Sequence, residues 1–218
     1  MKLGFFGDTH TQHKWVELRE PVDYLIFSGD GEFRNLGDIH SFNDWIGKLK
    51  KQGDIKVECL ITSGNHDSYP QSKLKETKLT FTNGVYLQDE EYILNNGMKV
   101  WMSPWSVRFM DWWFMASEED LETKYYSKIP RDTNILITHT PPYKILDYDT
   151  RNGYLGSKSL SKKIDELKEL KIHAFGHIHR DEEQRRQIIE GSNNVMFINC
   201  GLLDNWYNMV HDPIVVEV

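Results

Sequence analysis

The sequence has little cysteine and no long apolar run. Only two of its 218 residues are cysteine. Cys59 and Cys200 both lie in apolar, strand-like segments, so we expect buried, reduced thiols in a cytoplasmic protein. No apolar run approaches the roughly 18 residues of a membrane helix, and the N-terminal MKLGFFGDTH becomes polar too early for a signal peptide. No linker rich in proline, glycine or serine interrupts the chain, which favours a single domain over residues 1–218.

Positive charge is also in short supply. The chain has 26 Lys and Arg against 33 Asp and Glu, a net charge of −7. Nucleic acid is therefore not favoured as a partner, although a small nucleotide in a locally positive site stays open. The composition, 39% hydrophobic with 12% aromatic residues, is that of a globular protein. It does not indicate an oligomeric state.

Apolar strands that alternate with polar loops and helical segments predict an α/β fold. Residues 84–88 and 98–105 are expected to be antiparallel strands around an NNG turn. Ser159 is the expected N-cap of the last helix. The other expected strands are 2–6, 23–30, 56–67, 133–142 and 171–179, with further β structure at 185–190, 195–200 and 213–218 around a GSNN turn; the expected helices are 36–51, 118–128 and 159–170.

Each of the five main strands ends in a polar cluster. In α/β folds, sites form where the carboxyl ends of strands converge, so residues far apart in sequence can build one site. The clusters are Asp8 with His10, then Asp30, then Asn65 with His66 and Asp67, then His139, and finally His177 with His179.

These clusters have the composition of a metal site. Imidazole suits Zn, Fe, Mn or Ni, and carboxylate or amide oxygen favours the harder of these ions. Seven candidate ligands are too many for one tetrahedral ion but suit two ions that share a bridging group. Two divalent ions (+4) and two aspartates (−2) leave +2, which would attract a phosphate. The seven are Asp8, His10, Asp30, Asn65, His139, His177 and His179.

The motifs GDTH, SGD, SGNHD, THTPP and FGHIH, in this order, resemble the calcineurin-like metallophosphoesterase superfamily. Its motifs are D-x-H, G-D, G-N-H-[DE], H and G-H-x-H, and the match runs from residue 8 to about residue 200. FNDWIGKL, SPW and THTPPYKILD resemble the small metallophosphoesterase-domain subgroup, which includes cyclic-nucleotide phosphodiesterases. The resemblance implies a four-layer α-β-β-α sandwich of two mixed sheets.

The resemblance also implies roles for the residues. His66 would contact the phosphate or protonate the leaving oxygen, and Asp67 would fix the imidazole. A metal-bridging hydroxide would be the nucleophile. The two divalent ions would be Mn²⁺, with Fe, Zn, Ni or Co as alternatives. Asp8, His10 and His179 would bind the first ion, Asn65, His139 and His177 the second, and Asp30 would bridge them.

The function implied by this resemblance is a metal-dependent phosphodiesterase that acts on a small nucleotide-type phosphoester, with a cyclic nucleotide as the first candidate. One alternative is a non-catalytic metal-binding scaffold. The other is a phosphomonoesterase or protein phosphatase. Protein Ser/Thr phosphatases of the superfamily carry G-D-x-H-G and G-D-x-x-D-R-G, where this chain has GDTHT and GDGEFRN. A protein phosphatase is therefore the weaker expectation.

Residues 101–115, WMSPWSVRFMDWWFM, hold four tryptophans. Core packing is the favoured interpretation, and a substrate-cleft wall on which a base stacks is the second. Membrane docking is the third, but the segment lacks the basic face that would support it. Arg108 could clamp a phosphate, although a solvated arginine is the favoured interpretation. Gly176 should let the backbone approach the site, with Ile178 packed into the core. Four histidines outside the motifs are expected to be structural or surface residues: His13, His40, His173 and His211.

Overall fold

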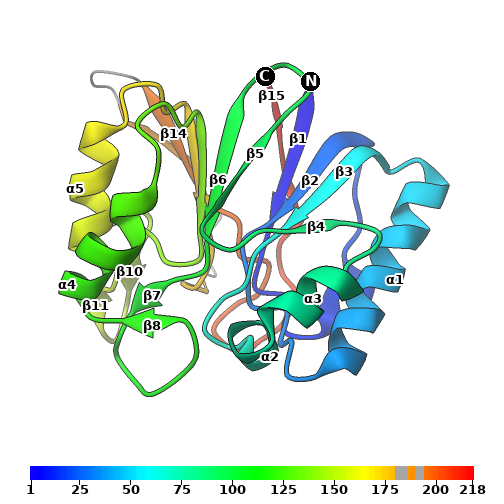
Figure 1. Cartoon of the computed structure of the whole chain (residues 1–218), viewed down its shortest axis with the longest axis horizontal. Helices are drawn as coiled ribbons and strands as arrows, with labels where there is room; N and C mark the ends of the chain where they lie inside the picture. The colour runs from blue at the N-terminus through cyan, green and yellow to red at the C-terminus, as the bar shows by residue number, and fades with distance from the viewer. Residues whose placement is uncertain (180–185, 190–193) are drawn as a thin grey trace.

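Two mixed β-sheets stack face to face, with helices on both outer sides (Figure 1). The structure is a computed structural model that describes residues 1–179, 186–189 and 194–218. The predicted four-layer α-β-β-α sandwich is confirmed. Both termini lie at one end of the molecule, where the amino group of Met1 donates a hydrogen bond of 2.8 Å to the carbonyl oxygen of Val218.

The first sheet has the strand order β15-β1-β2-β3-β4. Strands β1 to β4 are parallel to one another, and β15 pairs antiparallel with β1. The first and last strands of the chain are therefore neighbours in this sheet. The strands are β1 (Lys2–Phe6), β2 (Val22–Phe27), β3 (Ile55–Ile61), β4 (Val85–Tyr86) and β15 (Ile214–Glu217).

The second sheet has the order β13-β14-β12-β9-β6-β5. Its four central strands are parallel, and an antiparallel strand closes each edge. Both sheets thus direct the carboxyl ends of several parallel strands toward one region. The strands are β5 (Glu90–Ile93), β6 (Lys99–Ser103), β9 (Ile135–Thr138), β12 (Ile172–Phe175), β13 (Arg186–Ile189) and β14 (Val195–Asn199).

The apolar strands supply two cores at once, because successive side chains point to opposite faces of a sheet. In β9, Ile135 and Ile137 pack between the two sheets. Leu136, between them, packs on the outer side with Leu160. The continuous apolar runs of the sequence are therefore strands that are covered on both faces.

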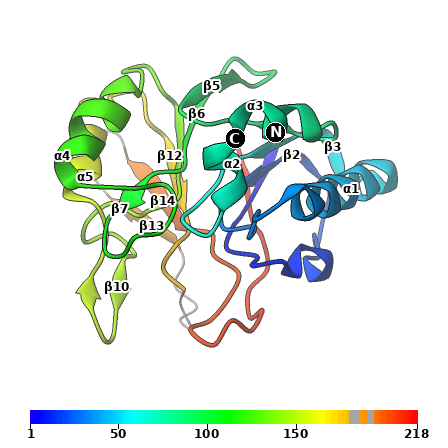
Figure 2. The ribbon, with the colours of Figure 1, turned by 60° about the horizontal axis from the view of Figure 1, so that its bottom comes forward.

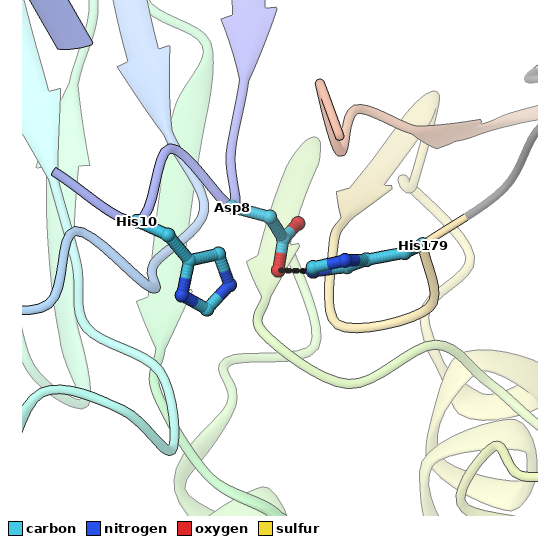
Figure 3. Close-up of side chains that lie close together, drawn as sticks. All are labelled: Asp8, His10 and His179. Carbon is cyan, nitrogen blue, oxygen red and sulfur yellow. Dashed lines mark ion pairs between the residues drawn. The ribbon is translucent and has the colours of Figure 1, made fainter. Parts of the chain in front are cut away.

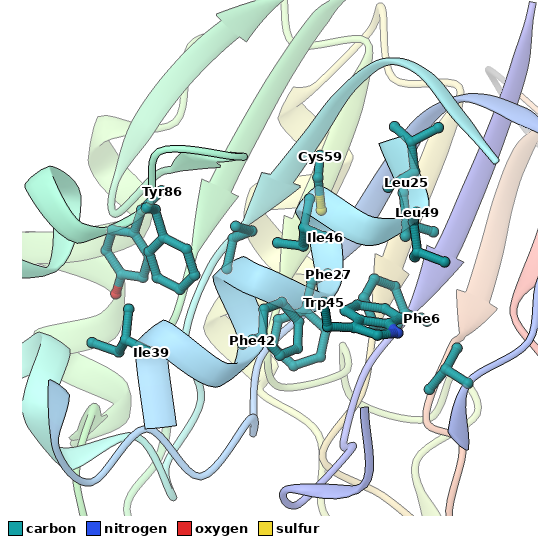
Figure 4. Packing of buried hydrophobic residues seen from close by; sticks show 14 of the residues in the cluster. Phe6, Leu25, Phe27, Ile39, Phe42, Trp45, Ile46, Leu49, Cys59 and Tyr86 are labelled. Carbon is teal, nitrogen blue, oxygen red and sulfur yellow. The ribbon is translucent and has the colours of Figure 1, made fainter. Parts of the chain in front are cut away.

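Helix α1 (Leu36–Gln52) covers the outer face of the first sheet. Its Phe42 and Trp45 pack against Phe6 and Phe27 of the strands (Figure 4). Asn35 caps its first turn, accepting hydrogen bonds from the backbone of Gly37 and Asp38. The short helices on this side are η1 (Gln12–Trp15), α2 (Ser68–Ser72) and α3 (Leu74–Thr80).

The other outer layer has a less regular helix than the sequence indicates. The segment predicted as one helix, 118–128, is an α-helical turn that changes into a π-helical and then a 3₁₀ turn. The last helix begins at Lys158, and its N-cap is Ser157, not Ser159. The elements of this layer are α4 (Glu118–Asp120), η2 (Leu121–Tyr125), η3 (Tyr126–Lys128) and α5 (Lys158–Glu166).

The predicted hairpin between residues 84–88 and 98–105 is wrong. Strand β6 pairs antiparallel with β5, whereas β4 pairs parallel with β3 in the first sheet. The strand β5, EEYI, is acidic and only partly buried, so its sequence carries little hydrophobic signal. The charged segment 180–185 and most of the GSNN turn lie outside the described residues.

Two small sheets extend from the second sheet on the side of α4 and α5 (Figure 2). They are formed by β7 (Ser106–Val107) with β8 (Met115–Ala116), and by β10 (Tyr148–Asp149) with β11 (Gly153–Tyr154). In the part of the chain that the structure describes, no helix has both the length and the apolar character to cross a bilayer.

Candidate functional site

All seven predicted ligand residues lie together beyond the carboxyl ends of parallel strands. The first sheet supplies Asp8 after β1, Asp30 after β2 and Asn65 after β3. The second supplies His139 after β9, and His177 and His179 follow β12. Neither sheet has a complete set of ligands, so the site depends on the two sheets being packed together.

Asp8, His10 and His179 form one group, with a potential ligand atom from each within 4.8 Å of the others (Figure 3). His179 Nε2 lies 3.8 Å from Asp8 Oδ1. His10 Nε2 lies 3.8 Å from Asp30 Oδ2, on the side of the second group. The three donors are two imidazoles and one carboxylate.

The second group is Asp30, His139 and His177, again within 4.8 Å. His139 Nε2 lies 3.2 Å from Asp30 Oδ2 and 2.9 Å from Asn65 Oδ1. Asp30 belongs to the second group but also lies near His10 of the first, so its carboxylate is near a histidine of each group. His177 and His179, although only two residues apart, belong to different groups, as expected.

Three of the site histidines are oriented by an oxygen atom next to Nδ1, the ring nitrogen that faces away from the site. His139 Nδ1 lies 3.1 Å from the carbonyl oxygen of Ser28, and His179 Nδ1 lies 3.1 Å from that of Asp204. His10 Nδ1 lies 3.3 Å from Glu32 Oε1. Because a carbonyl only accepts, the Nδ1 of His139 and of His179 carries the proton, and the Nε2 atoms of both rings face into the site. Metal-ligating histidines are usually held this way.

Glycines let the backbone approach the carboxylates closely. A Cβ on Gly176 would lie 2.1 Å from Asp8 Oδ2, and a Cβ on Gly64 would lie 2.3 Å from Asp30 Oδ1. Backbone N–H groups then bind the same carboxylates: the amide of His177 donates to both oxygens of Asp8, and that of His66 donates to Asp30 Oδ1.

The buried charges of the site shift each other's pKa values. Burial alone would lower the pKa of His139, but the Asp30 carboxylate outweighs it and raises this pKa to about 9. Burial would raise the pKa of Asp30, but the charges of His139 and His10 reverse that effect and lower it. Burial and the charge of His139 lower the pKa of His177 to about 3. The site thus concentrates groups that are costly to bury without a counter-charge.

The donors present fit divalent metal ions. His10 Nε2 is buried and has no hydrogen-bond partner among the described residues. Such an orphan nitrogen is costly, and a cation between it and Asp30 would satisfy both. Imidazole, carboxylate and amide donors without a thiolate suit first-row divalent ions.

His66 lies at the edge of the site, as expected for a residue that contacts substrate. Its Nδ1 lies 3.5 Å from Glu32 Oε1, and its ring contacts Trp112 edge-on at a centroid distance of 4.6 Å. Burial lowers the pKa of His66, although the charge of Asp30 opposes this effect. His66, Trp112 and Asn65 line a cavity of about 240 Å³ above the two groups.

Asp67 has a different position from the one predicted. Instead of fixing an imidazole, its carboxylate accepts hydrogen bonds from the backbone amides of Asp30, Phe33 and Gly64. Its buried carboxyl lies near Asp30, and burial together with that charge raises its pKa to about 7. Asp67 therefore shapes the loops that carry Asp30 and Asn65.

Arg108 lies at the surface, which agrees with the favoured interpretation of a solvated arginine and not with a phosphate clamp. It is exposed, donates to the carbonyl of Met115 and lines neither this cavity nor the larger one beside it. The four tryptophans of the same segment differ in position, and Trp113 is 45% exposed and lines neither cavity. Trp101 and Trp105 are core residues, whereas Trp112 is 43% exposed and forms a wall of the cavity.

Three residues of the site were missed by sequence reasoning: Glu32, Asp204 and Tyr207. The ring of Tyr207 packs edge-on against His10 and His179 at 4.8 and 5.0 Å. Asp204 and Tyr207 follow β14, so they could have been predicted from the pattern of polar residues after the carboxyl ends of strands. Glu32 is two residues after Asp30 in GDGE.

Two smaller expectations have mixed outcomes. Ile178 is buried, but it lines the cavity and is not part of a core cluster. His13 is structural as predicted: it bonds to Ser41 Oγ at 3.1 Å and packs against Phe42 and Trp45.

Fold and donor set define an α/β protein with a site suited to divalent metal ions. A model of the calcineurin-like phosphoesterase family matches residues 1–181. The chain belongs to this family and is accordingly a hydrolase of phosphoric esters.

Individual proteins are similar over nearly the whole chain. The human and mouse metallophosphoesterase domain-containing protein 1 are each 28% identical over 239 residues, covering 97% of this chain and 69% of their own length. Among solved structures, TT1561 of Thermus thermophilus superimposes with a TM-score of 0.65 at 11% identity, covering 92% of this chain and 88% of that one. The last likeness concerns the fold alone.

Proposed function

We propose that the chain is a dinuclear metal-dependent phosphodiesterase that acts on a small nucleotide-type substrate. The observation that carries this proposal is the pair of groups Asp8, His10, His179 and Asp30, His139, His177, with Asp30 near His10 of the first group. In the proposal, Asp8, His10 and His179 hold one ion, Asn65, His139 and His177 hold the other, and Asp30 bridges the two.

When bound, the two divalent ions would neutralise phosphate charge and acidify a water that attacks phosphorus. Mn²⁺ is the proposed ion, with Fe, Zn, Ni or Co as alternatives. The remaining steps belong to residues of the chain. Asn65 and His66 contact the phosphate, and His66 gives a proton to the leaving oxygen.

Glu32 supports this role of His66 because its carboxylate faces His66 Nδ1, which leaves Nε2 for the substrate. Burial lowers the pKa of His66, whereas the negative charge of a bound phosphate favours the imidazolium and opposes that shift. His66 would therefore be protonated, and ready to donate its proton, to a greater extent in the substrate complex than in the free protein.

A phosphodiester with a flat organic group suits the surroundings of the cavity. Phe109, Trp112 and Tyr207 line it, and their rings could stack on a base. A cyclic nucleotide is the first candidate substrate on this ground. A phosphomonoester is the alternative.

We further propose a single domain over residues 1–218 in a reducing compartment, the cytoplasm. Pairing of β1 with β15 ties the two ends of the chain into one sheet. Cys59 and Cys200 are buried thiols, and Cys200 Sγ donates hydrogen bonds to Ser28 Oγ and to the carbonyl of Phe175.

The test is hydrolysis of bis-p-nitrophenyl phosphate with added Mn²⁺, before and after chelation. We expect activity that chelation removes and Mn²⁺ restores, and loss of activity in Asp30→Ala and His139→Ala. His40→Ala is the matched control, because His40 is an exposed histidine outside the motifs. Full activity in Asp30→Ala, or none in the wild type with any of the named ions, would refute the proposal.

The role of His66 has a separate test. His66→Ala should lower turnover by roughly 10²–10⁴-fold, the usual contribution of a general acid, while the content of bound metal stays at the wild-type value. Loss of metal in this variant would mean that His66 is a ligand.

A further inference from the structure

A second cavity opens beside the first and shares part of its wall. Its volume is about 670 Å³, against about 240 Å³ for the cavity above the metal-binding groups. The first volume suits a phosphate and its immediate substituents, and the second lies in the range of pockets that bind small organic molecules. The residues common to both are Phe109, Asn152, Leu155, His177 and Ile178.

The second cavity is mostly apolar. Val107 and Met110 line it from the segment after β6, and Tyr143 and Tyr154 line it from the segment after β9. The two tyrosine rings meet edge-on at 5.8 Å. Lys158 lies beside them, with Nζ 5.1 Å from the centroid of the Tyr143 ring.

The acidic residue of this cavity, Glu118, is already fully engaged. Its carboxylate accepts hydrogen bonds from the hydroxyl groups of Ser157 and Ser159 and from the backbone amides of Lys158 and Ser159. It therefore has little capacity left for a cationic ligand. Apolar contact is the main interaction that the cavity offers.

We propose that this second cavity binds one ester group of the phosphodiester substrate and selects a bulky, apolar ring system. The inference rests on the proposed function. Because His177 belongs to a proposed metal-binding group and also lines the second cavity, a ring there can be joined to a phosphate at the metal centre. A small alkyl ester would not fill the second cavity and would not make these apolar contacts.

The first measurement compares two diesters with the same leaving group, methyl p-nitrophenyl phosphate and 1-naphthyl p-nitrophenyl phosphate. The leaving group is the same, so a difference in kcat/KM beyond the difference in the uncatalysed hydrolysis rates reports contacts with the other ester group. We expect the naphthyl ester to be favoured by at least about tenfold, because its ring removes much more apolar surface from water.

Tyr154→Ala tests whether the naphthyl group binds in the second cavity, and Tyr148→Ala is the matched control. The two tyrosines are cross-strand partners in the β10–β11 pair and are each 49% exposed. Only Tyr154 lines the cavity. Tyr154→Ala should reduce the naphthyl preference by at least about fivefold, the order of a few lost apolar contacts, and leave the methyl ester unaffected. Tyr148→Ala should keep the preference.

A binding measurement separates this inference from the proposed function. Calorimetry of the Mn²⁺-loaded protein with 1-naphthyl methyl phosphate and with dimethyl phosphate requires no hydrolysis. If the naphthyl ester binds more tightly and Tyr154→Ala removes this difference, the cavity proposal is supported, whether or not the diesters are hydrolysed. Absence of hydrolysis would refute only the proposed diesterase activity. Equal binding of the two esters, or a preference that Tyr154→Ala leaves intact, would overturn the cavity proposal.

Discussion

Gly176 shows how much the site depends on one missing side chain. Its φ is not in the left-handed region, so the constraint on this residue is space. A methyl group at this position would press on the Asp8 carboxylate, so Gly176→Ala should displace Asp8 and destabilise the fold by about 1–3 kcal/mol. We expect the variant to bind less Mn²⁺ per chain, measured by elemental analysis after dialysis.

The control for this prediction is Gly97→Ala. Gly97 has φ +86° in a turn where a Cβ would meet nothing within 4 Å. The change adds backbone strain of about 1 kcal/mol but no clash, so metal content should stay at the wild-type value. Equal metal content in both variants would contradict the steric argument.

His173 makes a prediction about pH. It is fully buried, and its Nε2 lies 2.8 Å from Thr138 Oγ1, whose own proton goes to the carbonyl of Thr140. Nε2 therefore carries the proton, and Nδ1 has no hydrogen-bond partner among the described residues. Burial lowers the pKa of His173 to about 3 from its ordinary value of 6.5.

The unfolded chain therefore takes up this proton as the pH falls below 6.5, whereas the folded chain does so only near pH 3. The free energy of unfolding should fall across this window, by about 2 kcal/mol at pH 5 relative to pH 7 from this residue alone. Urea unfolding at both pH values measures the loss. His173→Leu should be less stable at pH 7 but should lose less stability on acidification; an unchanged pH dependence would exclude this origin.

Residue-scale geometry is also where sequence reasoning ends. Asp8, His10, Asp30, Glu32 and His177 all have positive φ, between +40° and +69°, although none is glycine. Such conformations cost on the order of 1–3 kcal/mol each and persist only when tertiary contacts enforce them. The sequence predicts which residues gather, but the backbone that turns them inward depends on the packed sheets.

At the scale of elements, strands with continuous apolar runs could be predicted from the sequence, whereas the acidic edge strand β5 could not. β1, β2, β3, β9 and β12 each end before a polar cluster, as expected. The acidic β5 was missed, and β4 was therefore paired with the wrong strand.

Helix α1 gives the prediction at this scale. Asn35 accepts hydrogen bonds at its N-terminus, and Asp38 accepts in return from the amides of Arg34 and Asn35. Asn35→Ala should lower the free energy of unfolding by about 1 kcal/mol, measured by urea titration. Lys73, the exposed N-cap of α3, makes no side-chain capping bond, so Lys73→Ala should have little effect. Equal losses in the two variants would refute the capping argument.

At the scale of the whole molecule, the site joins the two sheets. Asp8, Asp30 and Asn65 come from one sheet, and His139 and His177 come from the other. Metal ions held between them would connect the two layers directly. Without ions, the same region holds buried carboxylates and imidazoles whose charges are only partly balanced. Ligand binding that is restricted to the folded state raises its stability.

We therefore expect Mn²⁺ to stabilise the fold through residues of both sheets. Free Mn²⁺ at 100 times its dissociation constant adds about 2.7 kcal/mol per site, which raises Tm by roughly 5–10 °C in a chain of this size. Thermal unfolding with Mn²⁺ and with a chelator measures the shift. Asp8→Ala and His139→Ala remove donors from different sheets, and each should reduce the shift in Tm, whereas His40→Ala should keep it in full. A shift that survives in both ligand variants would mean that Mn²⁺ binds elsewhere, because neither sheet has enough donors to hold the ions alone.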